Sequence, residues 1–181
     1  MKIYFVTSNK NKVKEVQKIT GSKHEIIQIE LEYPELRSDY PEEVARLAAK
    51  QLADKLNKAL FVEDSGLFIK ALNGFPGTCS SYIHQRIGLK GIIKLMEGVR
   101  DREAMYVSAV AYCEPGKKAL SFLGSEKGKI AYKIRGSHGF GHDPIFIPEG
   151  SKKTYGEMGD GGKQKKFRRK AVLKLLEYLE K

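Results

Sequence analysis

The chain has 181 residues, of which 41% are apolar and 30% are charged, and its net charge is +11. This composition predicts one globular domain over residues 1–181 and excludes a disordered or fibrous chain. The longest apolar runs are far shorter than the ~20 residues that cross a bilayer, so we expect no membrane partner. No export signal precedes the first strand-like run, and we therefore expect a cytoplasmic protein.

The positive charge suits a polyanionic partner. Charge alone leaves open nucleic acid, a membrane surface and a small phosphorylated substrate. Much of the excess lies at Lys10–Lys18 and at Lys163–Lys174. Both segments are predicted helix starts, where backbone N–H groups and the helix dipole attract phosphate. For any single lysine there, the alternative is a solvated helix face.

The first third of the chain alternates predicted strands and helices. Lys2–Val6 is a short apolar strand, and Thr7–Asn9 supplies N-cap residue types for a helix that Gly21 closes. Glu25–Leu31 alternates apolar and polar residues as a second strand. Pro41 then stands near the first turn of the next helix.

The middle of the chain predicts a short buried strand that ends in a polar turn. Ala59–Val62 is the strand, Glu63–Gly66 is the turn, and Leu67–Leu72 continues after it. A helix is predicted at Leu89–Glu97.

Predicted strands cluster in the last part of the chain. Ala104–Cys113 and Ala119–Phe122 form a hairpin, and Lys129–Ile134 and Pro144–Ile147 add strands. A closing helix runs from about Lys166 to Glu180. Because strands and helices alternate early and strands cluster late, the order of elements predicts an α/β fold with a mixed sheet.

Two early segments carry groups suited to phosphate and metal. The loop Thr7–Lys12 places hydroxyl, amide and ammonium groups together, which can hold phosphate oxygens or simply cap a helix. Glu63–Gly66, at the end of a buried strand, offers a carboxylate for Mg²⁺. A turn with side-chain hydrogen bonding is the alternative there.

Two later segments suit a base and a phosphate chain. Gly136–Pro144 combines three glycines with the flat rings of Phe140 and His142. Asp143 adds a hydrogen-bond acceptor, so this loop suits a purine ring, and a glycine-rich connection with a buried Phe is the alternative. Lys163–Arg169 can clamp phosphate, or it is a solvated basic helix start.

Taken in order, these segments resemble the inosine/xanthosine triphosphate pyrophosphatase family, and the resemblance covers nearly the whole chain. Each motif is modest, but six in the right order identify the family. The matching segments are Thr7–Glu15, Tyr33–Glu35, Glu63–Gly66, Asn73–Gly77, Gly139–Phe146 and Thr154–Met158.

The resemblance implies an elongated mixed sheet flanked by helices, in two lobes with the active site in the central cleft, and a homodimer. It implies hydrolysis of ITP, dITP or XTP to the monophosphate and pyrophosphate, which removes purine nucleotides with damaged bases. One Mg²⁺ per subunit is implied, with Glu35 and Asp64 as ligands. Asp64 would also accept the proton of the attacking water.

The implied substrate contacts come from several segments. Lys12, Lys163 and Arg169 would hold the phosphates, Ser65 would contact the substrate, and Phe140 would stack on the base. The predicted substrate-binding residues are Thr7, Ser8, Asn9, Lys10, Asn11, Lys12, Ser65, Phe140, Gly141, His142, Asp143, Lys163, Arg168 and Arg169.

Two departures from the family motifs bear on the base. His142 stands where Tyr or Trp is usual, which gives a smaller ring that can titrate. In the closing E-E-K-N-x-x-S-H-R motif, an ungapped alignment keeps Lys163 and Arg169 and replaces Ser and His by Phe167 and Arg168. A one-residue gap would instead put Phe167 at the His position and Arg168 at the Arg position. Either way the base-specifying histidine is missing, which affects the substrate range more than the reaction.

Two other functions remain open: a related pyrophosphatase acting on pyrimidine or modified triphosphates, and a basic nucleic-acid-binding protein. The second is disfavoured by Glu35, Asp64 and Asp143, because carboxylates in the motif loops repel a phosphate backbone unless a metal intervenes. We therefore expect a purine nucleoside triphosphate as the partner, and no nucleic acid.

Overall fold

The computed structural model describes residues 1–33, 37–159 and 165–181. Glu35 and Lys163, two of the predicted site residues, lie outside these ranges. Among the described residues, seven strands form one mixed sheet in the order β2-β1-β3-β5-β6-β7, with β4 paired to β3. The first three strands in this order are parallel and the others pair antiparallel, so the predicted α/β class with a mixed sheet is confirmed. The strands are β1 (Lys2–Val6), β2 (Glu25–Ile29), β3 (Leu60–Ile69), β4 (Pro76–Gly77), β5 (Glu103–Cys113), β6 (Leu120–Ile130) and β7 (Phe146–Pro148).

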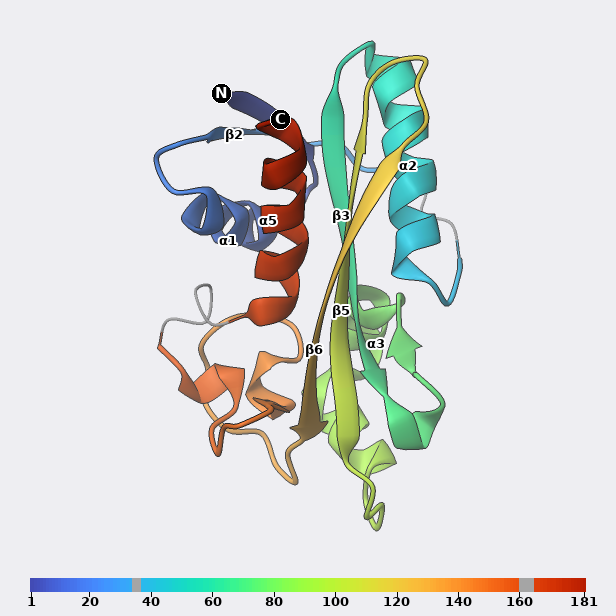
Figure 1. Cartoon of the computed structure of the whole chain (residues 1–181). Helices are drawn as coiled ribbons and strands as arrows, with labels where there is room; N and C mark the ends of the chain where they lie inside the picture. Colours follow the sequence, from blue (N-terminus) through green and yellow to red (C-terminus); the bar gives the residue numbers. More distant parts are fainter. Residues whose placement is uncertain (34–36, 160–164) are drawn as a thin grey trace.

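Helices cover both faces of the sheet, as Figure 1 shows: α1 and α5 lie on one face and α2 lies on the other. The core is divided in the same way, because side chains alternate along each strand. Phe61 of β3 packs with Val16 of α1 and Val172 of α5, whereas its neighbour Val62 packs with Leu52 of α2. The helices are α1 (Lys10–Thr20), α2 (Pro41–Leu56), α3 (Ser80–Leu95) and α5 (Lys166–Leu179), with short 3₁₀ turns η1 (Lys70–Leu72), η2 (Asp143–Ile145) and η3 (Tyr155–Glu157).

β3 is one continuous strand, so the predicted turn at Glu63–Gly66 is wrong. Every residue from Leu60 to Ile69 pairs with β5. Polar residues and a glycine suggested a turn, but pairing with a distant strand holds the segment extended. Gly66 is needed for a different reason: a Cβ there would lie 2.1 Å from the carbonyl oxygen of Gly77 in β4.

Two other elements are longer than predicted. α3 begins at Ser80 rather than Leu89, and Gly88 interrupts it with a φ of +61°. The predicted start therefore coincides with a break inside a longer helix. β6 continues well beyond Phe122, because its ladder with β5 extends to Lys129.

The end of the chain is predicted more accurately. The closing helix is confirmed as α5. The strand predicted at Lys129–Ile134 ends at Ile130, and Asp143–Ile145 forms a 3₁₀ turn before the three residues of β7. None of the helices in the three described ranges is long and apolar enough to cross a membrane.

Candidate active site

The loop between β1 and α1 caps its helix. The side-chain oxygen of Asn9 accepts hydrogen bonds from the backbone N–H groups of Asn11 (3.0 Å) and Lys12 (3.3 Å), and Thr7 Oγ1 accepts one from Asn9 (3.1 Å). The helix-capping alternative is thus confirmed for Asn9. This loop lies at the molecular surface, where backbone N–H groups at a helix start can also face an anion. Its exposed residues are Ser8, Lys10 and Asn11.

Glu63 lies at the centre of a buried set of ionic contacts. Its carboxylate accepts from Ser108 Oγ at 2.5 Å and from Arg168 Nε at 3.1 Å, and it lies 2.9 Å from Lys12 Nζ. The ammonium of Lys12 also donates to the Glu63 carbonyl oxygen at 2.8 Å. Burial by itself would raise the pKa of Glu63, but attraction by Arg168 and Lys12 outweighs it and lowers that pKa to about 2.

Glu15 extends these contacts to the start of α5. It pairs with Lys165 Nζ at 2.6 Å and with the guanidinium of Arg168. Lys165 also lies 2.8 Å from Asp143 Oδ2, and Arg168 Nη2 donates to Ser65 Oγ at 3.0 Å. Residues as far as 153 positions apart thus meet, and four of the predicted polar segments are joined. We call this set the ion cluster; its members are Lys12, Glu15, Glu63, Asp143, Lys165 and Arg168.

The ion cluster predicts an acid-sensitive fold. The lowered pKa of Glu63 means that its stabilising contribution is complete above pH 4.5, its ordinary pKa, and is lost as the pH falls towards about 2. We expect urea unfolding to show a loss of about 3 kcal/mol over this range from this group. Glu63→Gln should remove that part of the pH dependence, whereas Glu97→Gln, at an exposed position, should not. Equal pH profiles for the wild type and Glu63→Gln would contradict the assignment.

Asp64 does not share a face with the ion cluster. In the unbroken ladder of β3, Glu63 and Ser65 point to the side of α5, so alternation directs Asp64 to the side of Val62 and α2. Its side chain is buried, at 8% exposure. The sequence placed Asp64 at the end of a strand, and it lies in the middle of one.

The outer edge of β3 is open next to Asp64. β1 pairs with β3 at Phe61, and β4 pairs with it from Leu67 onwards. Between these points, residues 62–66 have no strand partner on that side within the described ranges. Lys12 reaches this edge through its bond to the Glu63 carbonyl. A ligand lying across the open edge can therefore contact Asp64 on one face and the β1–α1 loop on the other.

The glycine-rich loop is folded around Asp143. Asp143 Oδ2 accepts the backbone N–H of Phe140 at 2.7 Å, and a Cβ at Gly139 would lie 2.0 Å from the same oxygen. Gly139, with a φ of +78°, is therefore required for the carboxylate to close the loop. The ring of Phe140 is partly exposed, and Lys165 Nζ lies 4.1 Å from its centroid.

His142 is a buried ring rather than an exposed one. It is 3% exposed and makes an edge-to-face contact with His84 of α3, with centroids 5.1 Å apart. Burial, followed by the nearby His84, lowers the pKa of His142 to about 4. The ring is thus neutral at pH 7, in contrast to the titrating group expected from the sequence. His84 itself was missed, because it lies in a helix outside every motif.

The start of α5 separates two groups of basic residues. Arg169 is exposed, whereas Lys165 and Arg168 are both 2% exposed and fully paired. Phe167, at a position where the family has Ser or His, stacks on Tyr106 in the core with centroids 4.6 Å apart. The sequence grouped Lys165 with surface phosphate ligands. Its burial comes from tertiary contacts that no local pattern signals.

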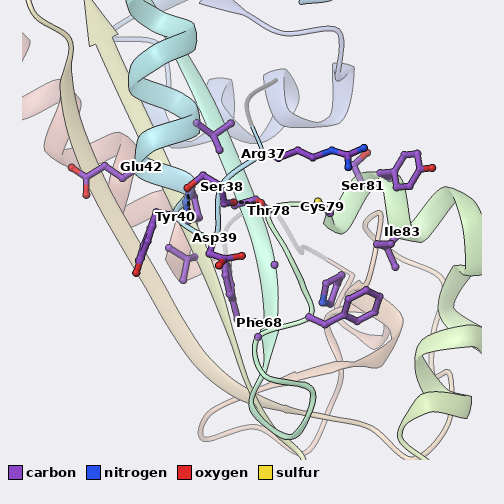
Figure 2. A pocket seen from close by; sticks show the side chains of 18 of the residues that line it. Arg37, Ser38, Asp39, Tyr40, Glu42, Phe68, Thr78, Cys79, Ser81 and Ile83 are labelled. Carbon is purple, nitrogen blue, oxygen red and sulfur yellow. Dashed lines mark hydrogen bonds between the residues drawn. The ribbon is translucent and has the colours of Figure 1, made fainter. Parts of the chain in front are cut away.

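A groove of about 1150 Å³ lies on the same face of the sheet as Asp64. Figure 2 shows Ser38 and Tyr40, before α2, on one side and Thr78 and Cys79, before α3, on another, with Phe68 of β3 below them. Thr78 Oγ1 donates to the Ser38 carbonyl at 2.5 Å and links the two sides. No residue of the ion cluster lines this groove.

The protein is an α/β protein with an open mixed sheet and helices on both faces. Its ion cluster lies beside the open edge of β3, where strand-to-helix loops meet. A model described as the Ham1 family matches residues 3–178, and the chain belongs to this family. This match, together with the similar proteins described next, confirms the family resemblance found in the motifs.

Among these relatives is the dITP/XTP pyrophosphatase of Methanopyrus kandleri, which is 48% identical over 88% of this chain and 85% of its own length. The protein of the same name from Methanosarcina acetivorans is 47% identical over 98% of this chain and 96% of its own. The solved structure of the Staphylococcus aureus Ham1 protein superposes with a TM-score of 0.85 at 28% identity, covering 99% of this chain and 98% of that one.

Proposed function

We propose that this chain hydrolyses dITP, ITP and XTP to the nucleoside monophosphate and pyrophosphate. The observation that carries the proposal is the meeting of the β1–α1 loop, the Glu63–Ser65 segment and the start of α5 at the open edge of β3. The names of the similar proteins from Methanopyrus kandleri and Methanosarcina acetivorans support the substrate class. A cytoplasmic location, expected from the lack of an export signal in the sequence, and a homodimer, implied by the resemblance, stay predictions.

The carboxylate of Asp64, beside the open edge of β3, suits Mg²⁺ bound together with a substrate. Mg²⁺ in nucleotide enzymes takes one or two carboxylates, several waters and substrate phosphate oxygens. The described ranges contain no cluster of three His, Cys, Asp or Glu side chains, so an all-protein cage is absent there. Asp64 and Glu35 are the residues that would hold the ion, since the carboxylate of Glu63 is already bonded to Ser108, Lys12 and Arg168. When bound, Mg²⁺ would supply charge neutralisation on the phosphates.

The protein's own groups would supply proton transfer, phosphate binding and stacking on the base. Asp64 would accept the proton of the water that attacks the α-phosphorus, and its burial keeps competing solvent low. The helix start at Ser8–Lys12 would hold phosphate oxygens through backbone N–H groups. Lys12 and Arg169 would balance the charge that develops on the pyrophosphate leaving group, together with Lys163. Phe140 would stack on the purine.

The deciding experiment measures pyrophosphate release from ITP, dITP, XTP, GTP, ATP, dTTP and UTP with Mg²⁺. We expect kcat/KM for ITP to exceed that for ATP by about 10⁴-fold, because a buried edge that binds hypoxanthine mispairs with the amino group of adenine. Equal values for ATP and ITP would contradict the base selection and leave the pyrophosphatase reaction in place. Preference for dTTP or UTP would instead support the pyrimidine alternative.

A further inference from the structure

Lys165 occupies a position from which it can act on the base site without touching the base. It is 2% exposed, and its ammonium lies 2.6 Å from Glu15 Oε1 and 2.8 Å from Asp143 Oδ2. The same nitrogen lies 4.1 Å from the centroid of the Phe140 ring. An ammonium has three N–H donors and no acceptor, so two carboxylates and one aromatic face satisfy it. No donor is left for a substrate.

Asp143 keeps one oxygen for another partner. Oδ2 accepts from Lys165 and from the backbone N–H of Phe140. Both of these contacts within the described residues fall on Oδ2, and neither involves Oδ1. An ionised Oδ1 accepts hydrogen bonds only, whereas a protonated carboxyl group can also donate one.

The proposed substrate bases and adenine differ at ring position 1. Hypoxanthine and xanthine carry N–H at position 1, which matches an acceptor, whereas adenine carries a bare nitrogen there. A carboxylate facing position 1 favours hypoxanthine and xanthine. When adenine enters, the carboxylate oxygen and adenine N1 are two acceptors that face each other.

We propose that Lys165 is a positioning residue that keeps Asp143 an ionised acceptor beside Phe140 and thereby sets the preference for purines with N1–H over adenine. This inference rests on the proposed function. It assigns a role to a residue that lies outside the family motif positions and replaces no motif residue.

The charges around Asp143 give Lys165 this control. Burial raises the pKa of Asp143, and attraction by Lys165 and the Phe140 N–H opposes that rise. The negative charge of Glu15 also raises the pKa of Asp143. The buried phenols of Tyr106 and Tyr155 also face the carboxyl group. Removing Lys165 takes away the cation and leaves the groups that favour the protonated acid.

The test compares kcat/KM for ITP and ATP in Lys165→Met between pH 6 and pH 9. We expect the ITP-to-ATP ratio to fall at least about tenfold at pH 7, mainly through KM, because a protonated Asp143 can donate to adenine N1. The ratio should recover as the pH rises and Asp143 ionises. Lys165→Arg should keep the ratio. Lys166→Met is the matched control, since Lys166 is the next residue and is exposed.

A folded Lys165→Met variant with an unchanged ratio, or with a loss that is the same at every pH, overturns the inference. If that variant does not fold, Asp143→Asn applies the same test: its amide can donate at any pH, so the ratio should fall without pH dependence. Absence of wild-type turnover on ITP would contradict the proposed function instead. The ratio of IMP to AMP affinity, measured by calorimetry on the same variants, tests Lys165 independently of turnover.

Discussion

Asp64→Asn is expected to lower kcat for ITP by at least about 10²–10⁴-fold at saturating Mg²⁺, the usual cost of removing a general base. The substitution keeps the size of the side chain and removes its charge, so both the proton acceptor and a proposed metal ligand are lost. Because Asp64 lies outside the ion cluster, the fold should survive. Steady-state kinetics and thermal unfolding of the same preparation measure the two effects.

Two comparisons sharpen this result. Asp101→Asn, at an exposed carboxylate paired with Lys70, should leave kcat unchanged. Isothermal titration with Mg²⁺ and a slowly hydrolysed triphosphate analogue should show weaker metal binding in Asp64→Asn than in the wild type. A variant that keeps more than a tenth of the wild-type kcat would show that Asp64 is not the base.

Arg168→Met is expected to lower the free energy of unfolding by about 3–5 kcal/mol, the usual effect of removing one partner from a buried ion pair. The guanidinium contacts Glu63, Glu15 and Ser65 from a fully enclosed position. Methionine restores much of the volume but leaves two buried carboxylates with fewer cations. The effect therefore comes from uncompensated charge rather than from a cavity. Urea unfolding at pH 7 measures it.

Arg169→Met provides the control, since Arg169 is the next residue of α5 and is exposed. Exposed substitutions of this kind change stability by about 0.5 kcal/mol or less. We expect Arg169→Met to weaken triphosphate binding instead, because that residue is assigned to the phosphates. Similar stability losses for the two variants would contradict the distinction between a buried and a ligand-facing arginine.

The motif order and the local signals in the sequence determined much of this protein. The strand Lys2–Val6, the cap before α1 and the apolar stripe of α5 are signalled by patterns within a few residues, and the structure contains all three. The α/β class followed from the order of such elements, and family membership followed from six short motifs. These features depend on periodicity and capping, which are visible in one segment at a time.

Only the tertiary structure decided which face of the sheet each polar residue lies on, and which polar residues are buried. Glu63–Gly66 is strand because β5, more than 40 positions away, pairs with it, and that pairing puts Asp64 and Glu63 on opposite faces. Lys165 and Arg168 look like surface cations in the sequence, yet Glu15, about 150 positions away, draws both into the interior. Burial and ion pairing are set by partners distant along the chain, and no local pattern carries that information.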